Sequence, residues 1–203
     1  VKDSSRVYLR YSYSWDRRPS DFQNQLENGH ELVGGIEGAI PIGKTEKLVG
    51  FLEIGCQNAN FADAYIVQEG IVTDDDDNNG TGVIRARLRY RLGPKTSMDA
   101  SLVKDMTFST RGNYQDRWAA DYNVNYNLMR GLVLRGTAYL DWTKASGDGT
   151  SATLFGFGVG TRYLLTDNLD LFTDVNWNRR NTIRVGFNTS WFTWTLGVTV
   201  YLQ

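Results

Sequence analysis

The sequence is poor in the residues that most often carry catalysis, cross-links and chain breaks. Its 203 residues include one histidine (His30), one cysteine (Cys56) and three prolines. A lone cysteine excludes an intrachain disulfide and leaves the redox compartment open. No apolar run is long enough for a membrane-spanning helix, which excludes a helical membrane protein. No N-terminal signal segment is recognised, which leaves open a mature chain from which the signal has been cleaved.

An excess of charge of either sign is also missing. Lys and Arg number 22 against 23 Asp and Glu, so the formal net charge is −1. This balance gives no electrostatic reason for a nucleic-acid partner, and we expect none. Aromatic residues make up 13% of the chain and charges of both signs are spread along it, which excludes disorder. Glycine is abundant and no segment shows a helical period, so the sequence indicates an all-β protein.

Nearly every segment between turn signals alternates apolar and polar residues with period two. Strands are expected at residues 6–15, 32–42, 47–57, 82–93, 98–108, 117–128, 132–142, 155–163, 169–177 and 182–203. The short connections are "GKTE", "GPKTS", "MRG" and "LTDN", and long ones follow the first, third, fifth and seventh strands. This pattern predicts one domain over residues 1–203, a transmembrane up-and-down antiparallel β-barrel of about ten strands. Twelve strands is the alternative, if residues 60–73 and a split of the last segment each add one.

The apolar face of these strands has aromatic residues near both of its ends. Tyr90, Tyr126 and Tyr163 lie just before three of the short turns. Toward the long connections the same face carries Tyr13, Trp15, Phe108, Trp118, Trp142, Phe155 and Trp177. Aromatic residues favour strands in general, but their position near the rims favours two membrane-interface belts around a lipid-facing band.

On this pattern the chain resembles the bacterial outer-membrane β-barrel class over nearly its whole length. The resemblance implies an integral outer-membrane protein, in contact with the lipid bilayer and lipopolysaccharide, with both termini on the periplasmic side. Two features depart from the class. The chain ends in "TVYLQ" rather than in a terminal aromatic residue. Lys104 falls on the face expected to contact lipid, where we expect it to snorkel or to be turned inward by a bulge.

The stretch "GVIRARLRYRLG" places Arg85, Arg87, Arg89 and Arg91 on one face of a strand and apolar residues on the other. We expect these arginines to line the lumen together with the other charged residues of the polar faces: Arg6, Arg10, Arg135, Arg162, Glu31, Glu37, Glu53, Asp99, Asp105, Asp121, Asp141, Asp170 and Asp174. Guanidinium groups pair well with carboxylate and phosphate, so such a track can bind and pass anionic solutes. In this it is similar to the arginine-lined lumens of acidic-sugar porins. The other interpretation is that opposite charges in a narrow lumen pair with each other and fill it.

Other candidate sites are weaker. The acidic run at residues 74–77 offers oxygen ligands for Ca²⁺ but lacks the spacing of a calcium loop, so we expect no metal and no cofactor. His30 stands in no Asp-x-His or His-x-Ser arrangement, so we expect a polar residue at a strand end and no enzyme. Cys56 falls on the lipid face, where a free thiol behaves as a small apolar side chain.

The sequence therefore predicts an outer-membrane channel for the passive passage of small hydrophilic solutes, anions among them. The alternative is a closed barrel that serves as a structural protein, as an adhesin, or as the barrel component of a secretion or polysaccharide-export assembly.

Overall fold

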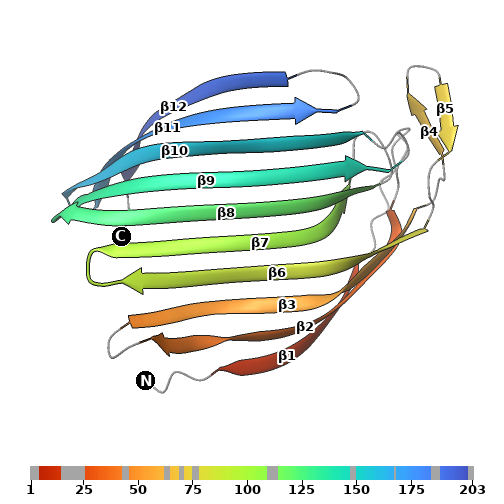
Figure 1. Ribbon diagram of the computed structural model, residues 1–203, viewed down its shortest axis with the longest axis horizontal. Helices are drawn as coiled ribbons and strands as arrows, with labels where there is room; N and C mark the ends of the chain where they lie inside the picture. Colours follow the sequence, from red (N-terminus) through yellow and green to blue (C-terminus); the bar gives the residue numbers. More distant parts are fainter. Residues whose placement is uncertain are drawn as a thin grey trace.

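Ten strands form one antiparallel sheet, and almost all neighbours in it are consecutive in the chain. In this computed structural model the order is β1-β2-β3-β6-β7-β8-β9-β10-β11-β12 (Figure 1). Their bounds are β1 Arg6–Ser14, β2 Leu26–Ile42, β3 Glu46–Phe61, β6 Asn78–Leu92, β7 Thr96–Phe108, β8 Tyr114–Met129, β9 Leu132–Ala145, β10 Ser151–Thr166, β11 Leu169–Thr182 and β12 Asn188–Val200. The predicted all-β, up-and-down antiparallel fold of the barrel class is confirmed.

The structure describes residues 5–14, 26–42, 46–61, 65–68, 71–74, 78–108, 114–146, 150–166, 168–183 and 188–200. For residues 26–27, 40–42, 46–47, 61, 65–68, 71–74, 78–79 and 108 it describes the backbone alone. Trp15, residues 75–77 of the acidic run and the end of the chain at 201–203 lie outside these ranges. The sheet is strongly curved, and its two edges, β1 and β12, are not hydrogen-bonded to each other within the described residues.

The alternative of twelve strands depended on residues 60–73 and on the last segment, and these two segments differ in the structure. Residues 60–73 do form two short strands, β4 (Tyr65–Gln68) and β5 (Ile71–Asp74). These pair only with each other, in a hairpin that stands beyond the long-connection end of the sheet (Figure 1). The last segment contributes one strand, β12, in unbroken register with β11. Several strands also extend further toward the long connections than predicted, because backbone pairing continues where the apolar alternation has ended.

Short turns close one end of the sheet and fix which strands are neighbours. Gly93 and Gly131 adopt positive φ angles of 71° and 81° in the β6–β7 and β8–β9 turns, a conformation that glycine reaches without steric cost. The first residue of β1 and the last residue of β12 lie at this same end, where Figure 1 marks both termini. The two ends of the sheet therefore differ, as the alternating connection lengths predict.

Strand register sorts the side chains into two faces of opposite character. Successive side chains of a strand point to opposite faces, so cross-strand partners share a face. On one face, here called the inner face, Val33 and Val83 are fully buried and Glu53, Asp170 and Asn178 nearly so. On the other, the outer face, large apolar side chains such as Val7, Leu9, Phe192, Trp194 and Leu196 are mostly exposed. Buried carboxylates thus lie on the inner face and exposed large apolar side chains on the outer face, the reverse of a water-soluble sheet protein.

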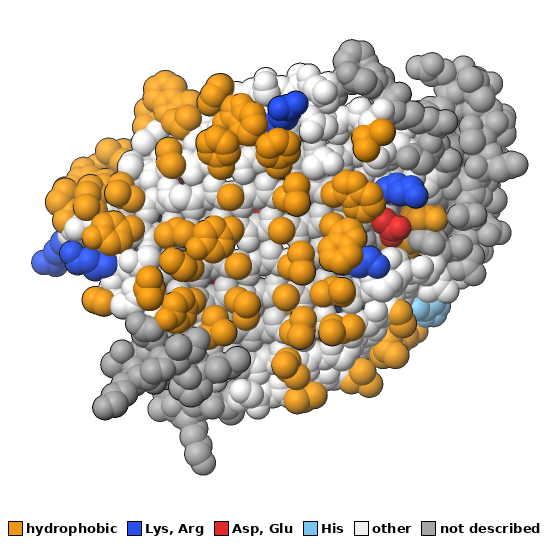
Figure 2. Space-filling model, viewed as in Figure 1, with side chains coloured by type: hydrophobic (Ala, Val, Ile, Leu, Met, Phe, Trp, Pro, Cys, Tyr) orange, Lys and Arg blue, Asp and Glu red, His pale blue; other side chains and the backbone are white. Residues whose placement is uncertain are grey.

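Figure 2 shows hydrophobic side chains spread over the face of the sheet that is seen in Figure 1, with charged side chains at its margins. Among the described residues, no helix has the length and apolar character needed to cross a membrane.

Candidate functional site

The inner face carries the charged residues that the sequence assigns to the lumen. Rows of paired residues bring them side by side: Glu53 on β3 lies opposite Arg85 on β6, Arg89 opposite Asp99 on β7, and Asp105 opposite Arg117 on β8. Arg6, Arg10, Glu31 and Glu37 continue the same face on β1 and β2. Asp121, Arg135, Asp141, Arg162, Asp170 and Asp174 continue it on β8 to β11. The alternation in the sequence placed these residues on a common face, and their partners are set by register.

The tightest cluster joins four strands around two glutamates. Arg85 donates from both terminal nitrogens to the two oxygens of Glu31, with N–O distances of 2.9 and 2.6 Å. Arg10 donates to Glu53 at 3.0 Å and to Glu31 at 3.3 Å. Tyr8 donates its hydroxyl to the other oxygen of Glu53 at 2.8 Å. Glu53 is buried but has three donors close by, so its charge is compensated, as a buried carboxylate requires.

Glycines on the inner face let side chains meet across an intervening strand. Tyr8 and Glu53 lie on β1 and β3, with Gly35 of β2 between them in the row. Arg135 of β9 reaches Asp174 of β11 at 2.9 Å over Gly160 of β10. A Cβ atom added to Gly35 would overlap the Tyr8 ring, and one added to Gly160 would overlap the Asp174 carboxylate. These bridges therefore depend on glycine at the middle position.

The residues that complete such bridges were not predicted from the sequence. The Tyr139 hydroxyl donates to the amide oxygen of Asn178 over Gly156, in the same arrangement. Neither Tyr8 nor Asn178 carries charge, so neither was included among the residues predicted to line the lumen, which were chosen for their charge. A glycine at an inner position, flanked on both neighbouring strands by polar side chains, is the signal that identifies them once the register is known.

The middle of the inner face holds an uneven set of charges. Arg87 and Arg89 both donate to the single carboxylate of Asp99, at distances of 3.1 to 3.2 Å. Arg91 follows them on the same face and is exposed. Asp121 accepts a hydrogen bond from Ser101 at 3.2 Å. Two arginines on one aspartate leave a local excess of positive charge.

Three more arginine–aspartate pairs lie between β8 and β11. Arg117 pairs with Asp141 at 2.8 Å, Arg135 with Asp174, and Arg162 with Asp170. Asp105 lies opposite Arg117, and one of its oxygens is buried without a hydrogen-bond partner among the described residues. The described side chains include no group of three His, Cys, Asp or Glu residues that could hold a metal ion.

Arginines and carboxylates differ in how far they reach water. In the ion pairs of the inner face, from Arg6–Glu37 on β1 and β2 to Arg162–Asp170 on β10 and β11, the arginine side chain is more exposed than its acidic partner. Arg89 is 64% exposed against 17% for Asp99, and Arg162 is 50% exposed against 4% for Asp170. The carboxylate groups lie close to the backbone of the inner face, and the longer arginine side chains extend past them toward the solvent. The inner surface thus presents guanidinium groups to water although the residues are largely paired.

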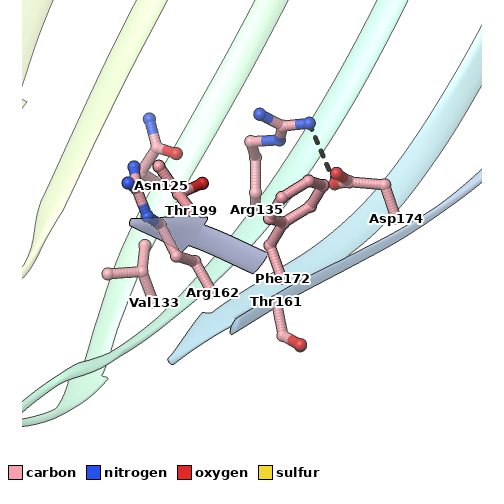
Figure 3. Close-up of a pocket in the computed structure, with 8 residues that line it drawn as sticks. All are labelled: Asn125, Val133, Arg135, Thr161, Arg162, Phe172, Asp174 and Thr199. Atoms are coloured by element: carbon pink, nitrogen blue, oxygen red, sulfur yellow. Dashed lines mark hydrogen bonds and ion pairs between the residues drawn. The ribbon is translucent and has the colours of Figure 1, made fainter. Parts of the chain in front are cut away.

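A cavity of about 460 Å³ opens on the inner face near the short-turn end of β9, β10 and β11. Arg135, Arg162, Asp174 and Phe172 line it, with Asn125 of β8 and Thr199 of β12 at its sides. Figure 3 shows these side chains gathered together, with the Arg135–Asp174 ion pair at one edge. The cavity combines exposed cations, neutral hydrogen-bonding groups and one aromatic ring.

Most of the predicted interface aromatics can be located on the outer face. Tyr13, Trp118, Tyr126 and Tyr163 are exposed there, whereas Tyr90, Trp142, Phe155 and Trp177 are half-buried among neighbours. Trp118 lies directly opposite Trp142, and the Phe155 and Trp177 rings meet edge to face at 5.6 Å. Phe108 belongs to β7, but its side chain is not described.

On the outer face, Lys104 and His30 each have a polar side chain close by. Lys104 stays in unbroken register with Trp118, so no bulge turns it inward. Its Nζ lies 3.4 Å from the Thr81 hydroxyl and 5.7 Å from the centre of the Trp118 ring. The lysine side chain therefore snorkels toward the long-connection end of the sheet. His30 Nδ1 is hydrogen-bonded to the Tyr11 hydroxyl at 2.7 Å, and Cys56 is an exposed free thiol.

The family model described as "Putative MetA-pathway of phenol degradation" matches residues 48–195. No curated protein matches the chain. Among solved structures, the chain is similar to the copper transporter OprC, with a TM-score of 0.57 and 11% sequence identity. The match covers 99% of this chain and 40% of that transporter, so this chain spans less than half of its length. At this identity the likeness shows the fold alone.

Proposed function

Because the chain belongs to the family described as "Putative MetA-pathway of phenol degradation", and its fold is that of a membrane β-barrel, we propose that it is an outer-membrane channel. The channel passes small hydrophilic solutes passively, and it favours anions. Its outer face contacts the lipid bilayer and lipopolysaccharide of a bacterial outer membrane. No catalytic step and no cofactor are part of this proposal. The family description names phenol degradation, which makes small aromatic compounds natural candidate solutes.

The excess exposure of arginine over its acidic partners is the observation that carries the anion preference. A passing solute meets Arg87 and Arg89 before it meets the more buried Asp99. Guanidinium groups that line a polar passage attract and coordinate anions, while a buried carboxylate repels them less. The charges therefore act together as a weakly cationic surface, although the formal charge of the whole chain is close to zero.

Ion selectivity in planar bilayers tests this proposal. In a salt gradient, the purified protein is expected to give conductance steps with a reversal potential on the anion-selective side. Arg87→Gln combined with Arg89→Gln shifts this potential toward the cation side, and Asp99→Asn shifts it the other way. Lys104→Gln, which removes a cation from the outer face, leaves it unchanged and is the matched control. Silence across all voltages contradicts the channel.

A closed barrel is the second candidate, and the cluster around Glu31 and Glu53 favours it. There the two glutamates and Arg85 are largely buried and satisfied by one another, as expected of side chains that fill a barrel. Such a protein would serve as a structural element, an adhesin or the membrane part of a secretion or polysaccharide-export assembly. Electrically silent protein that still shows heat-modifiable migration and fractionates with outer membranes supports this candidate over the channel.

A further inference from the structure

We infer that the cavity on β8 to β12 is a binding site for a small aromatic carboxylate. This inference rests on the proposed channel function, because it identifies where inside the passage a solute pauses and what chemistry it carries. The cavity, of about 460 Å³, falls within the usual size range of small-molecule sites. It lies on the inner face near the short turns, away from the tightly paired cluster around Glu53.

Two arginines supply the anion-binding part of the site. Arg135 and Arg162 are each about half exposed, whereas their partners Asp174 and Asp170 are 17% and 4% exposed. Asp174 engages Arg135 through one terminal nitrogen, and a guanidinium has five N–H donors, so several remain for a ligand. A carboxylate that enters the cavity can therefore accept hydrogen bonds from Arg135 without displacing its ion pair with Asp174.

Phe172 supplies the apolar part. Its ring projects from the inner face of β11, opposite Arg162 on one side and Gly197 of β12 on the other. A Cβ atom added to Gly197 would overlap the ring, so the ring lies directly against the β12 backbone. Its remaining surface lines the cavity beside both arginines (Figure 3). An aromatic ring presented next to exposed guanidinium groups matches a ligand with an aryl ring and an attached carboxylate, because such rings pair favourably edge to face or offset.

The neutral groups at the sides fit the same ligand. Asn125 and Thr199 border the cavity and offer an amide and a hydroxyl. Both can hydrogen-bond a ring hydroxyl or the second carboxylate oxygen without adding charge. Among the lining residues that the structure describes, Asp174 is the one acidic side chain, and Arg135 holds its carboxylate. The site is therefore selective for anions over cations of the same size.

Benzoate is the probe that tests the site, with acetate as the probe that lacks a ring. Saturable benzoate binding is measured by titration calorimetry on the folded protein in detergent micelles, and block by benzoate is measured in planar bilayers. Arg135→Gln or Arg162→Gln is expected to weaken benzoate binding about tenfold, because a hydrogen-bonded charge is lost. Phe172→Leu is expected to weaken benzoate roughly fivefold and acetate hardly at all.

Controls separate this site from the channel as a whole. Arg89→Gln changes an exposed inner arginine outside the cavity, so it shifts ion selectivity but leaves benzoate affinity unchanged. Arg162→Lys keeps the charge and tests the planar fork if the glutamine variant fails to fold. Conductance without saturable benzoate binding contradicts the proposed site but not the channel. An equal loss of benzoate affinity in Arg89→Gln and Arg135→Gln has the same meaning. Saturable binding by a silent protein refutes the channel instead.

Discussion

The Arg85–Glu31 ion pair is expected to be the strongest single charge interaction inside the sheet, and its strength can be measured. The perturbation is a double-mutant cycle with Arg85→Gln, Glu31→Gln and the two together. A cycle isolates the energy of the pair from the separate cost of each substitution. The same cycle on Arg6 and Glu37 provides a matched control, because that pair also joins an arginine to a glutamate on the inner face.

The geometry sets the expected magnitude. Arg85 makes two hydrogen bonds to Glu31, at 2.6 and 2.9 Å, and the side chains are only 23% and 14% exposed. Hydrogen bonds to charged groups contribute about 1.5–3 kcal/mol each. Arg10 also pairs with Glu31, and Glu53 with Arg85, so each partner keeps one charged neighbour when the other is replaced, and the measured coupling is smaller than the sum of the two bonds. We therefore expect a coupling energy of about 2 kcal/mol. Arg6 and Glu37 are 70% and 41% exposed, and such exposed pairs contribute about 0–1 kcal/mol.

Reversible urea unfolding of the protein in lipid vesicles, followed by tryptophan fluorescence and by folded-band migration on gels, yields the free energies of the variants. The coupling energy is expected to be larger for Arg85–Glu31 than for Arg6–Glu37. Equal couplings, or a value near zero for the buried pair, would refute the view that burial and paired geometry decide which inner charges hold the sheet together.

Two further predictions concern packing and the membrane face. Gly55→Ala is expected to lower the free energy of unfolding by about 1–3 kcal/mol in the same assay, because the added Cβ would overlap the Val33 backbone. Gly34→Ala serves as the control, because a Cβ at Gly34 meets open space. Equal effects of the two substitutions contradict the close packing at Gly55. Trp194, 72% exposed on the outer face, is expected to be quenched strongly by brominated lipids in a single-tryptophan variant, and Trp191, opposite Asn178 on the inner face, weakly; equal quenching contradicts the face assignment.

Several features of this protein follow from the sequence alone, because they depend on local periodicity. Alternation with period two requires one polar and one apolar face on each strand, wherever that strand lies in the sheet. The arginines at positions 85, 87, 89 and 91 therefore share a face by geometry. The difference between short and long connections likewise predicts an up-and-down order with two unlike ends, and the sheet has that order.

The partners of these residues depend on register, which pairs residues far apart in the sequence. Arg85 meets Glu31 because β2, β3 and β6 align as they do, and a shift by one residue would move either side chain to the other face. The contacts that pass over Gly35 and Gly160 join strands that are not neighbours in the sheet, so no local sequence pattern predicts them.

The relative exposure of arginine and carboxylate also arises only in the folded sheet. It reflects how far each side chain reaches above its neighbours, and composition does not contain that information. The sequence by itself determined that charges line one face. The tertiary structure decided that the acidic ones lie beneath and the guanidinium groups face the water, since burial is a property of the assembled neighbours rather than of any one strand.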